Sequence, residues 1–272
     1  MRRFFRRVRL IVKKVLSEPL LKPYRFIRKP VLSIKCILFP LTIPNTSYFQ
    51  RASVAYRIEK ISWNVRCTHQ QSHTGSFISS FISIPSTKEG CIVEAGCFKG
   101  GSAAKFSVAA KLVNRELVVF DSFQGLPENE EPHDRNITGN SIKGWFKGGN
   151  YCGTLEEVKS NIEKFGEIDV CTFIKGWFED TMPNFSNKIC AAYLDVDLAS
   201  STRTCLKYLY PLVIPGGVLI SQDGDFPLVI DVFSNDEFWE KEVGCQKPHI
   251  EGLGKSKIIK IVKPTKKIIP KE

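Results

Sequence analysis

Four polar side chains follow two apolar segments that have the character of buried strands. Asp195 and Asp197 come directly after CAAYL, and Gln222 and Asp223 come directly after GVLIS. Residues two apart on an extended chain point to the same side, so the first two acids can act together. Oxygen ligands without neighbouring His or Cys suit a hard cation such as Mg²⁺. We therefore predict a metal site formed by Asp195, Gln222 and Asp223; the alternative is that these acids cap a helix beginning near Ser200.

A glycine-rich turn follows another apolar segment, CIVEA. It contains Gly96, Gly100 and Gly101 and continues into Ser102. Glycine lets the backbone turn tightly and approach a ligand, and Ser102 can cap the next helix, whose free N–H groups would face an anion. We predict that this turn binds a nucleotide-like cofactor. Its spacing differs from the G-x-G-x-x-G of dinucleotide-binding folds, which disfavours NAD, and a plain strand-to-helix turn is the alternative.

Two further segments end in residues suited to a nucleoside. Asp121 ends ELVVFD about 20 residues past the glycine turn, where a carboxylate can accept both hydroxyl protons of a ribose. Gly176 and Trp177 end VCTFIKGW, which would put a flat aromatic ring near the base. The alternatives are a simple loop acid and a core tryptophan.

The segment from residue 122 to residue 150 is too long and too polar for an ordinary connection in a compact domain. We predict that it forms a lid. It contains His133, which could reach a substrate, although a single histidine in a loop is more often solvated.

Apolar strand patterns and amphipathic helix patterns alternate along the rest of the chain. Two helices are expected first, over residues 50–62 and 74–84. Strands are then expected at 91–95, 116–121, 170–176, 188–197, 217–223 and 257–263, with helices at 102–113, 154–166, 200–213 and 229–242. This alternation predicts an α/β fold with a mostly parallel sheet covered by helices on both faces. Ligands of such sheets bind beyond the carboxyl ends of the strands, where all the residues above fall.

Four ordered motifs resemble one known family. They are IVEAGCFKGGSA, VVFDSFQGLPE, IKGWFEDTMP and YLDVDLASSTRTCLKYLYPLVIPGGVLI, between about residues 91 and 222. The resemblance is to the macrocin O-methyltransferase family, whose members use S-adenosylmethionine and Mg²⁺ to methylate sugar hydroxyls. It implies the class I methyltransferase fold, Rossmann-like, with a seven-stranded sheet ending in an antiparallel hairpin. The first 70 residues or so match no known pattern.

The resemblance also implies roles for individual residues. Asp121 becomes the ribose acid, Trp177 lines the adenine, Asp195 is the first metal ligand and Asp197 is the general base. The methionine part of the cofactor is assigned to Glu94, Gly96, Gly100, Gly101 and Ser102, with Gly176 beside the adenine.

Gln222 departs from the family pattern, which has two adjacent acids at the end of this strand. A neutral carbonyl oxygen can ligate a metal, but the lost charge should lower affinity. Asp225 could compensate, or the metal could be dispensable. Two alternatives follow: a metal-independent methyltransferase acting on another small nucleophile, and a non-catalytic, membrane-associated protein that holds the cofactor.

The formal net charge of +11 is concentrated at the two ends of the chain. Residues 1–29 carry 11 Lys and Arg against one Glu, and residues 255–272 carry 7 Lys against one Glu, so the body has a net charge of −5. A nucleic-acid-binding domain usually carries its basic patch on the folded body, which disfavours nucleic acid as a partner. In residues 2–16 the apolar side chains fall on one helical face and the cations on the other, as in helices that lie on anionic membranes. A mobile basic tail or a docked helix is the alternative.

The nine cysteines form no C-x-x-C pair, which predicts free thiols and a reducing, cytoplasmic location, with contact at the inner face of the membrane left open. The longest apolar stretch, residues 31–44, is interrupted by Lys35 and Pro40 and is too short to span a bilayer. Three regions are expected: a basic segment and linker at 1–49, a methyltransferase domain at 50–263 and a basic tail at 264–272. The expected partner is a small-molecule or lipid-linked sugar, and homo-oligomers are left open.

Overall fold

The computed structural model describes residues 47–68 and 71–265. The chain divides into two compact units, one ending at Tyr56 and the other beginning at Arg57. Of the first unit, residues 47–56 are described, and they contain the first turns of helix α3 (Tyr48–Asn64). The predicted amphipathic segment 2–16 lies outside the described residues, and the three expected regions stay a prediction.

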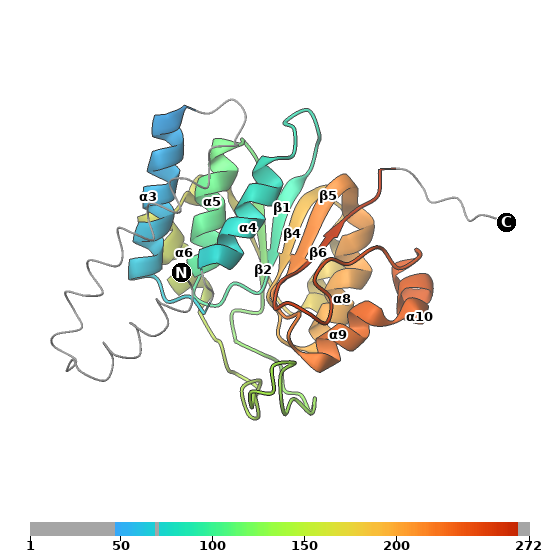
Figure 1. Ribbon diagram of the computed structural model, residues 1–272. Coiled ribbons are helices and arrows are strands. Elements are labelled where there is room, and N and C mark those ends of the chain that lie inside the picture. Colours follow the sequence, from blue (N-terminus) through green and yellow to red (C-terminus); the bar gives the residue numbers. More distant parts are fainter. Residues whose placement is uncertain (1–46, 69–70, 266–272) are drawn as a thin grey trace, which may run out of the picture. The chain divides into compact units, whose positions relative to one another are not determined.

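The second unit is built on one six-stranded sheet (Figure 1). Its strands lie in the order β3-β2-β1-β4-β5-β6, and β6 alone among them is antiparallel. The strands are β1 (Cys91–Ala95), β2 (Leu117–Asp121), β3 (Cys171–Lys175), β4 (Ile189–Leu194), β5 (Val213–Ser221) and β6 (Ile259–Val262). The α/β fold with a mostly parallel sheet, predicted from the alternation of patterns, is confirmed.

The described residues form six strands where seven were expected. At the free edge of β6, Glu251 pairs with Lys260 through two backbone hydrogen bonds of 2.9 and 3.0 Å, but this is an isolated bridge. The segment therefore approaches the position of a further strand without extending into one. Gly252 and Gly254, one and three residues after Glu251, both have positive φ angles and turn the chain away from an extended path.

Helices cover both faces of the sheet (Figure 1). One face carries α4 (Gln71–Ile82), α5 (Gly101–Leu112) and α6 (Leu155–Phe165), and the other carries α7 (Phe178–Thr181), α8 (Ala199–Leu209), α9 (Pro227–Ser234) and α10 (Asp236–Phe238). Short turns complete the unit: η1 (Ile168–Val170), η2 (Met182–Asn184), η3 (Tyr210–Leu212) and the π-helical η4 (Trp239–Val243). Among the described residues, no helix has the length and apolar character needed to cross a bilayer.

The helix expected over residues 229–242 is broken at Asn235. This residue has an extended backbone and its side-chain oxygen accepts a hydrogen bond of 2.9 Å from the Phe238 N–H. Asparagine competes for backbone hydrogen bonds in this way, which makes it a better cap than an interior helix residue. The segment consequently forms α9, α10 and η4 instead of one helix.

The central strands are buried from end to end. All five residues of β1 and all six of β4 are buried, because helices cover both faces and the sequences CIVEA and ICAAYL leave few polar groups to solvate. From β1 the chain adds β2 and then β3 on one side of the sheet, and it then crosses back to add β4 and β5 on the other side of β1. Ligands of open α/β sheets bind at such a reversal, beyond the carboxyl ends of the strands.

Candidate active site

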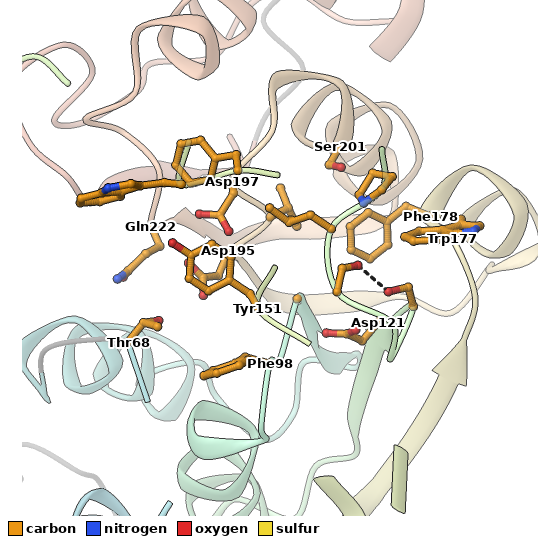
Figure 2. Close-up of a pocket in the computed structure, with 18 of the residues that line it drawn as sticks. Thr68, Phe98, Asp121, Tyr151, Trp177, Phe178, Asp195, Asp197, Ser201 and Gln222 are labelled. Atoms are coloured by element: carbon orange, nitrogen blue, oxygen red, sulfur yellow. Dashed lines mark hydrogen bonds between the residues drawn. The ribbon is translucent and has the colours of Figure 1, made fainter. Parts of the chain in front are cut away.

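A cavity of about 350 Å³ lies at the carboxyl ends of the strands. Figure 2 shows Asp195, Asp197 and Gln222 on one side of it and Asp121 with Trp177 on the other. Of the predicted site residues, those that line the cavity are Gly96, Asp121, Gly176, Trp177, Asp195, Asp197 and Gln222. The fold therefore gathers seven predicted residues, from the ends of five strands, around one space.

Three carboxylates form a cluster in this region. One oxygen from each of Asp195, Asp197 and Asp223 lies within 4.8 Å of the others. The Oδ2 atom of Asp223 accepts hydrogen bonds of 3.0 Å from the N–H groups of Val196 and Asp197. Its Oδ1 atom is buried and has no hydrogen-bond partner among the described residues. Burial, reinforced by the neighbouring Asp195 carboxylate, raises the pKa of Asp223 to about 7.

Gln222 lies beside the cluster, but its side-chain oxygen already has a partner. The Tyr193 hydroxyl donates a buried hydrogen bond of 2.7 Å to Gln222 Oε1. A carbonyl oxygen has a second lone pair, so ligation by Gln222 stays a prediction. Asp225, the other candidate to supply the missing charge, lies with its Oδ1 atom 3.6 Å from Lys257 Nζ.

The acids do not serve as the cap of the following helix. The first N–H groups of α8, from Ala199 and Ser200, instead donate hydrogen bonds of 2.8 and 2.9 Å to Glu131 in the 122–150 segment. Asp197 itself has a φ of 61°, a left-handed conformation that costs a non-glycine residue free energy. Glu131, and not Asp195 or Asp197, therefore caps α8.

Gly96 brings the tips of β1 and β4 into close contact. Its φ is +82°, and a Cβ atom placed there would lie 2.1 Å from the main-chain oxygen of Asp195. The Gly96 N–H donates to Phe120 O at 2.9 Å, and the Asp195 N–H donates to Ala95 O at 3.0 Å. Only glycine fits this turn. Because Gly96 has no side chain, it also occupies none of the cavity that it lines.

The rest of the glycine turn has other surroundings. Helix α5 begins at Gly101 with Gly100, at φ 76°, as its N-cap, so the prediction that Ser102 caps the helix is wrong. Ser102 is buried and is the second residue of the helix, so it does not occupy the capping position. A Cβ on Gly101 would meet Cys67 at 2.9 Å, so this glycine lets the start of α5 approach the segment that follows α3. Glu94 is fully buried within β1. Glu94, Gly100, Gly101 and Ser102 are therefore not among the residues that line the cavity.

Asp121 has a structural role in addition to its place in the cavity wall. Its two carboxylate oxygens accept hydrogen bonds of 2.7 Å from the N–H groups of Cys97 and Phe123. Burial raises the pKa of Asp121, while these hydrogen bonds act in the opposite direction. The carboxylate therefore ties the glycine turn to the end of β2 and still faces the cavity, which Trp177 lines from the end of β3.

Comparison with known proteins identifies the family. A family model described as macrocin O-methyltransferase (TylF) matches residues 83–243, more than half of the chain. This chain belongs to the macrocin O-methyltransferase family. The family assignment predicted from the four motifs is confirmed.

Curated relatives of the family match about half of the chain. A tetracenomycin-C rhamnosyl 4'-O-methyltransferase from Streptomyces olivaceus is 32% identical over 139 residues, which cover 49% of this chain and 52% of the relative. The mycinamicin III 3''-O-methyltransferase of Micromonospora griseorubida is 29% identical over 146 residues, covering 51% and 56%. The chain thus spans about half the length of the curated relatives it matches.

Solved structures with the same fold match more of the chain. The O-methyltransferase NovP superposes with a TM-score of 0.55 at 23% identity, over 77% of this chain and 80% of its own. The calicheamicin methyltransferase CalS11 superposes with a TM-score of 0.57 at 16% identity, over 91% and 94%. This likeness establishes the class I methyltransferase fold expected for the family.

Several residues that line the cavity were not predicted from the sequence. Phe98 and Tyr151 are two of them, and their rings meet edge to face with centroids 6.2 Å apart. Partial burial and the carboxylates of Asp197 and Asp195 raise the pKa of the Tyr151 hydroxyl. Phe98 lies inside the glycine turn and could have been found there, whereas nothing in the sequence indicates that Lys257, which precedes β6, lines the cavity.

Residues of the 122–150 segment line the cavity, and Glu131 ties the segment to the start of α8. Besides capping α8, Glu131 accepts a hydrogen bond of 3.0 Å from His133, whose buried ring packs against Phe146 with centroids 4.7 Å apart. Burial acts to raise the pKa of Glu131, but the hydrogen bonds from His133 and from the start of α8 outweigh it and lower this pKa to about 2. His133 is therefore an internal support of this segment rather than a solvated residue.

Proposed function

We propose that the protein is an S-adenosylmethionine-dependent O-methyltransferase that transfers a methyl group to a hydroxyl of a sugar or glycoconjugate, assisted by Mg²⁺. One observation carries the proposal: a single cavity is lined by residues suited to the nucleoside and by two members of the three-carboxylate cluster. Membership of the family and the names of its relatives support the same chemistry.

The residues that line the cavity suit S-adenosylmethionine. The cofactor supplies a methyl group on a positively charged sulfur, which a nucleophile can displace. Gly96 leaves no side chain in the cavity wall, Asp121 offers carboxylate lone pairs to the ribose hydroxyls, and Trp177 presents an aromatic ring for the adenine. These residues would hold the reacting groups in line, and such positioning can lower a barrier by about 7–11 kcal/mol.

The carboxylate cluster fits a divalent cation. Asp195 and Asp223 would be its charged ligands, with the Gln222 oxygen as a neutral one. The buried Oδ1 atom of Asp223 has no donor among the described residues, and a bound cation would remove the cost of that state. When bound, Mg²⁺ would lower the pKa of a neighbouring substrate hydroxyl.

Asp197 is proposed as the general base. It is the member of the cluster that is not assigned to the metal, it lines the cavity, and its main-chain N–H donates a hydrogen bond to the Asp223 carboxylate. In the reaction the hydroxyl proton passes to Asp197, an oxygen–methyl bond forms and the sulfur–methyl bond breaks. The products are a methyl ether and S-adenosylhomocysteine.

Calorimetric titration with S-adenosylmethionine, with and without Mg²⁺, tests the proposal when combined with a screen of diol-bearing glycosides. We expect the cofactor to bind, and at least one glycoside to yield S-adenosylhomocysteine in a reaction that EDTA stops and Mg²⁺ restores. A rate unaffected by EDTA would instead favour the metal-independent methyltransferase. Absence of cofactor binding would contradict the whole proposal, and binding without turnover on any glycoside would favour the non-catalytic alternative.

The basic N-terminal segment supports a proposal for where the protein meets its acceptor. Residues 2–16 combine cations and apolar side chains at helical spacing. We propose that the protein acts in the cytoplasm and contacts the inner face of the membrane through this segment, which would bring lipid-linked sugars within reach.

A further inference from the structure

A second groove, of about 530 Å³, lies directly beside the cavity. Phe98, Trp145 and Tyr151 line both spaces, so the two are adjacent. The Trp145 side chain is 48% exposed, which is unusual for so large an apolar ring. Aromatic walls of this kind are typical of small-molecule sites, where they pack against the flat faces of ligands. The groove therefore places an aromatic surface next to the cavity, on residues other than the carboxylates.

Among the described residues, two cations line the groove and no acidic residue accompanies them there, whereas the one cation of the cavity wall, Lys257, lies among carboxylates. Arg66 and Lys99 both line it, and both lie over the Phe98 ring, at 5.7 and 5.9 Å from its centroid. No acidic residue is among the described residues that line the groove, whereas the cavity wall includes Asp195 and Asp197. The acceptor region thus has an acidic end, where the metal is proposed, and a basic end.

The two cations differ in how far their charges are already compensated. Lys99 Nζ lies 2.5 Å from Glu157 Oε1. Arg66 is exposed, and no carboxylate of the described residues forms an ion pair with it. A guanidinium that rests on an aromatic ring keeps its planar fork of donors for a carboxylate or phosphate. Arg66 is accordingly the main candidate for an anion contact and Lys99 the secondary one.

We propose that this groove is an acceptor subsite for an anionic group, a phosphate or a carboxylate, attached to the sugar that is methylated. The inference rests on the proposed function and narrows its substrate class. Arg66 and Lys99 bind the anion, and Trp145 and Tyr151 pack along the sugar between the anion and the carboxylate cluster. A sugar phosphate and a uronic acid carry the same chemistry, so the test must separate them.

Binding of three probes to the full-length chain tests the proposal: glucose 1-phosphate, methyl glucuronide and neutral methyl glucoside, titrated by calorimetry with and without S-adenosylhomocysteine. At least one anionic probe should bind more tightly than the neutral one. Arg66→Gln should weaken that probe about tenfold, as expected when one hydrogen-bonded charge contact is lost. Whichever anionic probe binds more tightly identifies phosphate or carboxylate as the source of the charge.

Two further variants make the test specific. Glu157→Gln releases Lys99 from its ion pair and should strengthen binding of the anionic probe by about two- to fivefold, the range of a partly exposed pair. Lys188→Gln, the matched control, removes a cation whose Nζ pairs with exposed Glu89 before β4 begins, at the opposite end of the strand, and should change nothing.

Three outcomes would overturn the proposal. They are equal or weaker binding of both anionic probes relative to the neutral one, an Arg66→Gln effect no larger than that of Lys188→Gln, and loss of S-adenosylhomocysteine affinity in Arg66→Gln, which would assign Arg66 to the cofactor. A chain that binds no S-adenosylhomocysteine contradicts the proposed function instead, and the titrations without it keep the two failures apart.

Discussion

Asp197 occupies a backbone conformation that few aspartates adopt. Its φ of 61° is maintained because Asp223 Oδ2 accepts hydrogen bonds from both the Val196 and the Asp197 N–H groups. Non-glycine residues in this region cost about 1–3 kcal/mol and persist where the surroundings fix them, often at functional sites. The same carboxylate that is proposed to bind the metal therefore also sets the position of the proposed base.

Replacing Asp197 by Asn should separate proton transfer from cofactor binding. The amide keeps the size of the side chain but cannot accept the hydroxyl proton, so turnover should fall by about 10²–10⁴-fold. Affinity for S-adenosylmethionine, measured by calorimetry, should stay within twofold or so, since that side chain is assigned to the acceptor. Asp231→Asn, on the exposed side of α9, is the control. Turnover equal to that of the control would remove Asp197 from the mechanism.

Gly96 and Gly139 provide a matched pair for testing the close approach of the strand tips. Their φ angles are +82° and +81°, but a Cβ on Gly96 would meet Asp195 O at 2.1 Å whereas one on Gly139 would meet nothing within 4 Å. Alanine should cost about 1–2 kcal/mol of unfolding free energy at either position because of φ. Overpacking should add about 1–3 kcal/mol at Gly96 alone.

Urea unfolding measures both glycine variants. We expect Gly96→Ala also to abolish binding of S-adenosylmethionine, since the turn and the tip of β4 must separate, while Gly139→Ala leaves binding intact. Equal unfolding free energies for the two variants would mean that the turn tolerates the added methyl group.

At the level of elements, the sequence predicted most of the sheet because parallel strands carry their signal locally. The apolar segments before Asp121 and Asp195 are buried on both faces, and their polar ends mark the strand tips. What was missed depends on contacts between distant segments. Nothing around Lys257 or Tyr151 indicates that these residues reach the cavity, and the role of Glu131 requires knowing that the 122–150 segment returns to α8.

Glu131 is the contact that ties the 122–150 segment to α8, and its removal should loosen that segment. Glu131→Gln keeps the shape but loses the charge that accepts hydrogen bonds from Ala199 and Ser200 at the positive end of the helix. We expect a loss of about 1–2 kcal/mol of unfolding free energy and faster proteolysis within 122–150. Neighbouring, exposed Glu130 provides the control, Glu130→Gln.

The same contact sets a pH dependence with a defined sign. The pKa of Glu131 is lowered from its ordinary value of 4.5 to about 2, so the folded state favours the ionised carboxylate. Its contribution to stability is complete above pH 4.5 and is lost as the pH falls toward 2. The difference in unfolding free energy between the wild type and Glu131→Gln should therefore shrink across that window. A difference that stays constant with pH would show that the contact acts through shape alone.

For the molecule as a whole, charge of opposite sign is concentrated in different parts of the sequence. The body, with a net charge of −5, contains the carboxylate cluster, while residues 1–29 and 255–272 carry the excess of cations. A uniformly basic protein would bind any polyanion, whereas the cations of residues 1–29 are separated in the sequence from the carboxylate cluster and can be attracted to an anionic surface. In the other basic stretch, Lys257 belongs to the folded unit and lines the cavity. The proposed membrane contact depends on this separation and on the apolar face of residues 2–16.

Vesicle sedimentation distinguishes an inserted helix from a basic tail. The full chain should sediment with vesicles containing an anionic lipid and not with neutral ones, and deletion of residues 2–16 should release it. A second variant, with Phe4, Phe5 and Ile11 replaced by Ser, keeps every charge but removes much of the apolar face. Release of this variant would indicate insertion among acyl chains. Retention, with binding lost in high salt, would indicate a tail held by charge alone, and sedimentation unchanged by the deletion would eliminate the segment as the anchor.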